Sequence, residues 1–180
     1  MAPPRLRDVT VLTVDRERRA TSERGMDALY RAHAAEALRL GYLLTGDRAL
    51  AEDLLQDAFV RVLGRFHDLR NRDAFWWYLR RTIVNLSTSY FRRRGVERAW
   101  LARQRPDEAA PAPHDLAERD RLREALMTLR PEQRAAIVLR FYEDLSEADT
   151  AEALGVPLGT VKSTVSRGLE RLRQQLPEEA

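Results

Sequence analysis

The stretch that most constrains this chain is SEADTAEALGVPLGTVKSTVSRGLERLR, which covers residues 146–173. Ser146 has the hydroxyl of a helix N-cap, and Asp149 stands three residues later as its capping-box partner. Gly155 can take the left-handed conformation that ends a helix, and a proline and a second glycine follow it. The pattern predicts two short helices joined by a tight turn.

The two predicted helices have complementary faces. The apolar face of the first consists of Ala151, Ala153 and Leu154, and that of the second of Val161, Val165, Leu169 and Leu172. The polar face of the second consists of Lys162, Ser163, Thr164, Ser166, Arg167 and Arg171. The spacing of Ala151, Gly155 and Val161 is typical of a helix-turn-helix: a small residue, a glycine four positions later and a β-branched residue six positions after that. The second helix of such a motif enters the DNA major groove. The alternative is an ordinary helical hairpin with a solvated basic face, but caps, turn and polar face together favour DNA binding.

The composition sets bounds on this interpretation. With 180 residues the chain has room for one ordinary domain or two small ones. The net charge is only +3, so the protein is no polycation that coats any nucleic acid. Of the 31 basic residues all but one are arginine, which makes bidentate contacts to phosphate and guanine.

Several classes of protein are excluded by what the sequence lacks. Without cysteine there is no disulfide, thiol chemistry or cysteine-ligated zinc. The histidines His33, His67 and His114 lack metal-motif spacing, and there is no phosphate loop or nucleophile elbow, so we expect neither an enzyme nor a cofactor. No apolar run approaches the roughly 20 residues of a membrane span, and no signal peptide is evident. We expect a cytoplasmic protein without membrane insertion.

The chain divides into four segments by pattern. Residues 1–24 hold paired prolines and no helical stripe and predict a disordered leader, and Met26 could be an alternative start. Residues 25–94 predict a bundle of three amphipathic helices, interrupted at Gly46. Asp47 and Asp73 are expected to cap the second and third helices. A proline- and alanine-rich linker at 95–115 precedes a second helical domain at 116–176, so the expected fold is all-α with two small domains.

An acidic polar patch lies in the second predicted helix. Asp53, Gln56 and Asp57 share one face beside an apolar stripe. No histidine or third carboxylate has matching spacing, which leaves two interpretations. The patch is either a solvated face or a docking surface for a basic partner helix.

Four consecutive aromatics open the third predicted helix. Phe75 and Leu79 lie along an inward stripe, but four aromatics in a row cannot all face inward. At least one should be exposed beside Arg80 or Arg81, as in a surface that stacks single-stranded bases. The alternative is an aromatic core with a basic surface.

Taken together, these segments resemble an extracytoplasmic-function sigma factor of the sigma-70 family, most closely its SigE-like group. The matching stretches are YLLTGDRALAEDLLQDAFVRV, YLRRTIVNLSTSYFRRR and the block from LRPEQRAAIVLRFYEDLS to the helix-turn-helix. The resemblance implies a transcription initiation factor that directs RNA polymerase to promoters, with core polymerase (its β′ and β subunits) and promoter DNA as partners. An anti-sigma partner, the promoter sequence, the regulon, the inducing signal and the role of the leader stay open.

The resemblance also implies roles for individual residues. In sigma region 2 the β′ clamp helices would be bound by Asp53, Leu54, Gln56, Asp57 and Phe59. The −10 element would be bound and held open by Trp77, Tyr78, Arg80, Arg81, Asn85, Arg92, Arg93 and Arg94. In sigma region 4 the −35 element would be read by Thr160, Lys162, Ser163, Ser166, Arg167 and Arg171. Ser166 stands where some relatives carry a larger residue, so the base preference cannot be copied.

Two other functions compete with this one. A stand-alone helix-turn-helix repressor or activator would need a ligand or dimerisation domain, and residues 25–94 look like the aromatic and basic helix set instead. A helical adaptor without DNA binding is disfavoured by the intact Lys162 and Arg167 face. Stable binding to core polymerase separates the three.

Overall fold

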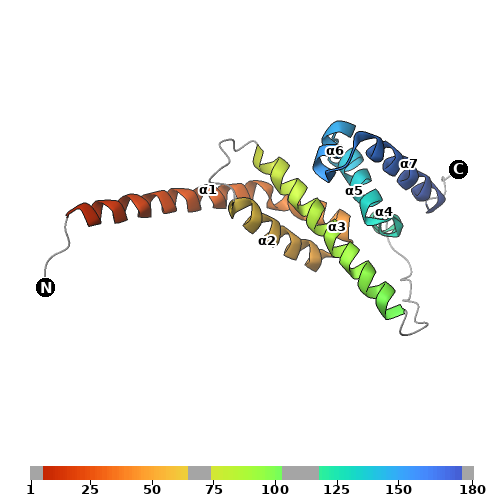
Figure 1. Cartoon of the computed structure of the whole chain (residues 1–180), viewed down its shortest axis with the longest axis horizontal. Helices are drawn as coiled ribbons and strands as arrows, with labels where there is room; N and C mark the ends of the chain where they lie inside the picture. The colour runs from red at the N-terminus through yellow and green to blue at the C-terminus, as the bar shows by residue number, and fades with distance from the viewer. Residues whose placement is uncertain (1–5, 65–73, 103–117, 176–180) are drawn as a thin grey trace. The chain divides into compact units, whose positions relative to one another are not determined.

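The computed structural model describes residues 6–64, 74–102 and 118–175, and every regular element in these ranges is a helix (Figure 1). The expected all-α fold is confirmed. The elements are α1 (Leu6–Thr45), α2 (Arg48–Gly64), α3 (Ala74–Ala102), α4 (Glu118–Thr128), α5 (Pro131–Ile137), a π-helix (Val138–Tyr142), α6 (Glu147–Leu154) and α7 (Leu158–Gln175).

The chain forms two compact units, residues 1–35 and residues 36–180, with the boundary inside α1. In the first unit the structure corrects the expected disordered leader, because α1 is helical from Leu6. Between Pro4 and Gly25 no proline or glycine interrupts the chain, and the arginines, the leucines, the two glutamates and Ala20 there are good helix formers. Asp27 and Arg31 add an i, i+4 ion pair of 2.8 Å.

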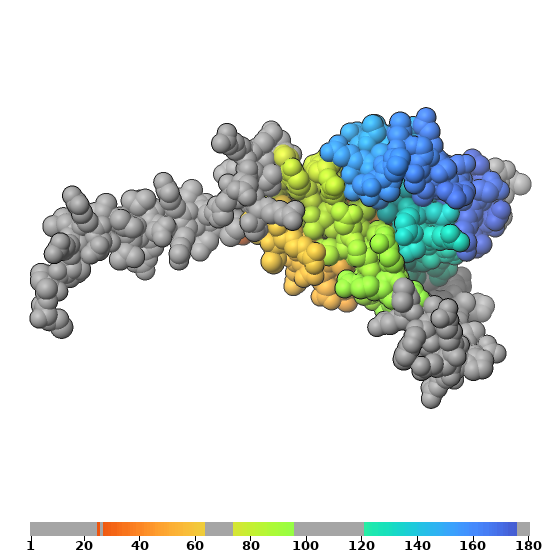
Figure 2. Space-filling model, in the orientation of Figure 1, coloured from red at the N-terminus to blue at the C-terminus, as the bar shows by residue number. Residues whose placement is uncertain are grey.

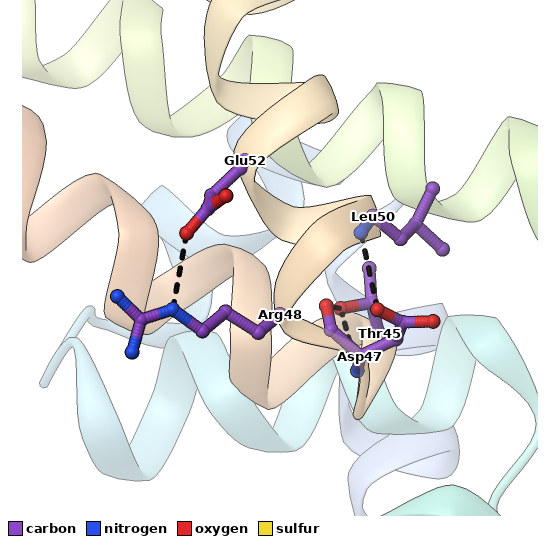
Figure 3. Close-up of polar contacts among 5 residues, drawn as sticks. All are labelled: Thr45, Asp47, Arg48, Leu50 and Glu52. Carbon is purple, nitrogen blue, oxygen red and sulfur yellow. Dashed lines mark hydrogen bonds and ion pairs between the residues drawn. The ribbon is translucent and has the colours of Figure 1, made fainter.

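The junction between α1 and α2 is fixed by local hydrogen bonds (Figure 3). Gly46 has a φ of 69° and ends α1, as the sequence predicts. The Asp47 carboxylate accepts from the backbone N–H of Leu50 at 3.2 Å, which confirms the expected cap of α2. The Thr45 hydroxyl donates to the Gly41 carbonyl at 2.8 Å, and Arg48 pairs with Glu52 at 3.0 Å.

Helix α2 packs along α3 (Figure 1), and their apolar stripes meet in a core. Phe75, Leu79 and Ile83 on α3 are completely buried, and the Phe59 ring lies 5.6 Å from that of Phe75. Burying each such side chain stabilises the fold by roughly 1.5–3 kcal/mol. This core sets which face of α2 and which face of α3 remain outside.

Helix α3 continues to Ala102, past the start of the linker expected at residue 95. The segment after Gly95 reads VERAWLA, which contains no proline and favours continuation of the helix. The expected cap Asp73 and the remainder of the linker, residues 103–115, lie outside the described residues.

Helices α4 to α7 build the second core. Pro131 occupies the first turn of α5, where its missing N–H breaks no hydrogen bond. Val161 and Leu172 of α7 are buried, and Val165 and Leu169 are half-buried. Gly168 lets α7 approach α5 closely, because a Cβ there would lie 2.5 Å from Cδ1 of Ile137.

Candidate nucleic-acid interface

The predicted helix-turn-helix is formed by α6 and α7. The Ser146 hydroxyl accepts from the Asp149 N–H at 3.0 Å and donates to the Asp149 carboxylate at 2.6 Å, which holds the start of α6. Gly155 ends α6 with a φ of 66°. Pro157 then starts the turn into α7, where its carbonyl accepts from the N–H of Thr160. The local geometry of a helix-turn-helix is therefore present.

The polar face of α7 is open to solvent. All six candidate −35 residues are exposed: Thr160, Lys162, Ser163, Ser166, Arg167 and Arg171. Arg167 donates from Nε to the Ser163 carbonyl at 3.0 Å and from Nη2 to the Ser163 hydroxyl at 3.2 Å. The Lys162 ammonium lies 3.5 Å from a Glu147 carboxylate oxygen. These contacts preorganise the two cations within their own helical hairpin.

The aromatic segment of α3 divides between core and surface as expected. Phe75 is buried, Trp76 and Trp77 are half-buried, and Tyr78 is exposed. The ring centres of Tyr78 and Trp77 lie 5.2 Å apart in an edge-to-face arrangement, and the Arg81 guanidinium lies 5.2 Å from the Trp77 ring centre. An exposed ring beside a cation can stack on a base and approach a phosphate.

Further along α3, the other candidate −10 residues differ in exposure. Asn85 and the three arginines Arg92, Arg93 and Arg94 are exposed. Arg80 is different, because its side chain is only 11% exposed and its Nε lies 2.7 Å from the Glu143 carboxylate. The structure thus engages Arg80 in a protein contact.

A cleft of 180 Å³ separates α3 from the helix-turn-helix, whose surfaces adjoin in Figure 2. On the α3 side it is lined by Asn85, Thr88, Ser89 and Arg92. On the other side it is lined by Glu132, Leu154, Val156, Thr160, Val161 and Thr164. The cleft brings two candidate −10 residues, Asn85 and Arg92, opposite the candidate −35 residue Thr160.

The acidic patch of α2 borders a second, more open hollow of 390 Å³. Its lining residues are Leu50, Asp53, Leu54, Gln56, Asp57, Arg61, Leu86, Tyr90 and Arg93. The structure brings together the exposed residues Asp53, Gln56 and Asp57 as predicted. Leu54 and Phe59 are 7% and 4% exposed, so these two position the helix from inside the core and offer little surface to a partner.

One surface residue of α2 is missing from the predicted set. Val60 is 72% exposed and follows Gln56 by one helical turn. The sequence could have indicated its exposure, because Val60 lies outside the apolar stripe of α2 and follows Gln56, a residue of the polar patch, by four positions. Val60 therefore leaves one apolar side chain on the surface beside the polar patch.

Other chemistry finds no support in the described part of the chain. No group of three or more His, Cys, Asp or Glu residues there could hold a metal ion. None of the helices described combines the length and apolar character needed to cross a membrane. His67 and His114 lie outside the described residues.

Comparison with known proteins identifies the class. A sigma-70 region 2 model matches residues 29–97, and a sigma-70 region 4 model matches residues 119–172. The RNA polymerase sigma-E factor of Streptomyces coelicolor is 38% identical over 139 residues, which are 77% of this chain and 78% of that protein. The sigma-E factor of Streptomyces avermitilis is 40% identical over 140 residues, with the same shares.

The fold agrees with these matches. The sigma factor RpoE of Bartonella quintana, solved in complex with the anti-sigma factor NepR, superposes with a TM-score of 0.64 at 25% identity. The superposition covers 88% of this chain and 98% of that one. The chain belongs to the extracytoplasmic-function sigma factors of the sigma-70 family. It acts in promoter-specific transcription initiation by RNA polymerase, with region 2 and region 4 as the parts that bind polymerase and promoter DNA.

Proposed function

We propose that the three exposed faces divide the work of initiation. The α2 face of Asp53, Gln56 and Asp57 binds the β′ clamp helices. The α3 face binds the opened −10 element, and the α7 face reads the −35 element in the major groove. The protein itself catalyses no step and positions the polymerase that does.

The polymerase site is supported by the shape and charge of the α2 surface. The hollow is lined by Asp53, Asp57 and Arg61 of α2 and by Arg93 of α3. A helix that offers basic residues to α2 and acidic residues to α3 matches this arrangement. Val60 adds an apolar anchor beside the acidic rim, since buried apolar contacts contribute more affinity than exposed charges.

The DNA sites are supported by exposed cations and donors on helical faces. Arg167 has the fork needed for bidentate contact with guanine, and Lys162 lies near the N-terminus of α7, where base edges are usually met. On α3, Tyr78 and Trp77 offer ring faces beside Arg81. A net charge of +3 neutralises few phosphates, so the free protein should bind promoter duplex weakly.

The carrying observation is the common exposure of Asp53, Gln56 and Asp57 above a buried apolar stripe. Replacing all three with alanine should lower the affinity for core polymerase by about tenfold to a hundredfold, measured by fluorescence anisotropy of labelled protein. Circular dichroism should show an unchanged helix content. Glu152→Ala, which removes an exposed carboxylate from α6, serves as the control and should bind normally.

Two results would count against this assignment. Equal loss of helix content and polymerase binding would make the α2 patch structural. A tight, promoter-specific complex of the free protein at physiological salt would favour the stand-alone repressor. As a further partner we propose an anti-sigma protein, on the similarity to the Bartonella quintana sigma factor solved with NepR.

A further inference from the structure

Three consecutive arginines in the second half of α3 have different surroundings. Arg92 lines the 180 Å³ cleft together with Asn85, which precedes it by two helical turns. The Arg94 guanidinium lies 5.9 Å from the ring centre of Tyr90. Arg93 lines the 390 Å³ hollow beside the acidic patch of α2. Successive residues of a helix point about 100° apart, so one partner cannot engage all three arginines in the same way.

The hollow that Arg93 lines holds charges of both signs. Asp53, Gln56 and Asp57 of α2 line it, and Arg61 adds a second cation. All five of these side chains are exposed. A partner that enters the hollow therefore meets carboxylates from α2 and a guanidinium group from α3 at the same time.

Arg93 belongs to this side of α3 by its position in the helix. Leu86 and Tyr90, which precede it by two turns and by one turn on the same face, also line the hollow. Nε of Arg93 donates to the Ser89 carbonyl at 3.4 Å, which holds the side chain to its own helix. The Nη atoms of a guanidinium fork are further donors, and their geometry matches the two oxygens of a carboxylate.

The neighbouring carboxylates decide which kind of anion fits beside Arg93. A DNA strand carries phosphates on successive nucleotides and no cation, so in the hollow it would face Asp53 and Asp57. Like charges that face each other across an interface oppose binding strongly. A protein helix can carry a carboxylate for Arg93 and, one turn away, basic side chains for the two aspartates. The hollow therefore favours a helix of mixed charge over a nucleic acid.

We propose that Arg93 binds a carboxylate on the same polymerase helix that the acidic patch of α2 binds, and that it does not contact the −10 element. The proposal rests on the assignment of Asp53, Gln56 and Asp57 to core polymerase and extends that site to α3. Arg93 also sets the direction in which the partner helix docks, because the reversed helix would bring its basic residues against the guanidinium. Arg92 and Arg94 keep their place in the −10 surface.

A charge series at position 93 tests the proposal in the full-length protein. Affinity for core polymerase, measured without DNA by fluorescence anisotropy of labelled protein, should fall in the order Arg93→Lys, Arg93→Gln, Arg93→Glu. The loss should reach about tenfold to a hundredfold in the last variant. Arg173→Glu makes the same charge change at an exposed position of α7 outside the proposed sites, and it should bind core polymerase normally.

Two results would overturn the role of Arg93 in binding polymerase. The first is an affinity for core polymerase that does not follow the charge at position 93 while circular dichroism shows a normal helix content, because a merely structural residue would not rank the variants by charge. The second is an equal loss of affinity in Arg93→Glu and Arg173→Glu, which would reduce the effect to net charge.

A second measurement asks whether Arg93 contacts DNA. At saturating core polymerase, the complex with Arg93→Glu should bind a single-stranded −10 oligonucleotide as tightly as the complex with the natural protein, whereas Arg94→Glu should weaken this binding. A loss of −10 binding in the saturated Arg93→Glu complex would return Arg93 to the DNA surface and overturn the proposal. The α2 assignment fails separately, if the triple alanine variant of Asp53, Gln56 and Asp57 binds core polymerase normally.

Discussion

The two surfaces that we propose face DNA, on α3 and on α7, differ in the contacts that their cations make. On α7 the cations Lys162 and Arg167 contact only groups of the helix-turn-helix itself and remain exposed. On α3 the cation Arg80 is buried against Glu143, far along the chain. The α7 face is therefore available in the free protein, whereas the α3 face depends on where region 4 lies.

This difference separates a local from a non-local structure. The α7 face is formed by one continuous stretch of sequence that contains its own caps and turn. Its residues are therefore exposed whenever this stretch is folded. The α3 face combines residues that are separated by more than 60 positions. The position of the α7 cations is therefore set within one short stretch, whereas that of Arg80 depends on a contact between distant segments.

The largest expected effect comes from the available face. Lys162→Ala and Arg167→Ala should each lower initiation at promoters that need the −35 element, by about 1–3 kcal/mol per base contact or roughly fivefold to a hundredfold. At least one should also relax the base preference there. Run-off transcription on a library of −35 variants measures both.

Both variants should fold normally, since Val161 and Leu172 carry the packing of α7. Ser163→Ala is a useful companion, because it removes the hydroxyl that accepts from Arg167. Unchanged transcription and unchanged −35 preference in both cation variants would mean that α7 does not read DNA, and the contrast between the two faces would disappear.

A second prediction concerns the packing that supports α7. In Gly168→Ala the new Cβ would lie 2.5 Å from Cδ1 of Ile137, so the end of this buried side chain must shift within the packed interface of α5 and α7. Overpacking of this kind destabilises by typically 1–3 kcal/mol, which a thermal melt should show as a lowered Tm. Gly159→Ala is the control within the same helix, because its Cβ would meet nothing within 4 Å. Equal melts would show that α5 and α7 adjust freely.

The sequence predicted the local features of both surfaces well. The caps at Asp47 and Ser146, the left-handed Gly46 and Gly155, and the exposure of one aromatic beside Arg81 all follow from neighbouring residues. These features are short-range, so spacing is enough to predict them.

The sequence did not predict what arises between distant segments. Nothing near Arg80 indicates that its partner is Glu143, and Gly168 looks like any helical glycine until α5 is placed against it. The length of α1 was also missed, because paired prolines and the lack of a helical stripe suggested disorder rather than helix. The residue roles at the polymerase and DNA surfaces stay predictions.

A smaller effect should follow loss of the α6 cap. Ser146→Ala removes the hydroxyl that accepts from the Asp149 N–H and should destabilise region 4 by about 1 kcal/mol. If α7 reads the major groove as we propose, −35-dependent initiation should fall slightly because α6 supports α7, while binding to core polymerase is unchanged. Chemical denaturation measures the stability of region 4, and run-off transcription measures −35-dependent initiation. Ser146→Asp keeps a capping acceptor and should behave like the natural protein, and a Ser146→Ala protein of full stability would show that the cap contributes nothing.

The smallest effect concerns pH and bears on the α3 face alone. Burial raises the pKa of Glu143 above its ordinary value of 4.5 and Glu36 adds to this, while Arg80 and Arg39 oppose it. In the folded protein Glu143 then binds a proton more readily than it does in water, so its contribution to stability grows as the pH falls from neutral towards 4.5 and shrinks as the pH rises. Glu143→Gln cannot titrate, so the Tm of this variant should lose that dependence on pH, which thermal melts between neutral pH and pH 4.5 would show. A natural protein whose Tm falls on this acidification relative to that of Glu143→Gln would show that the attraction of Arg80 outweighs burial.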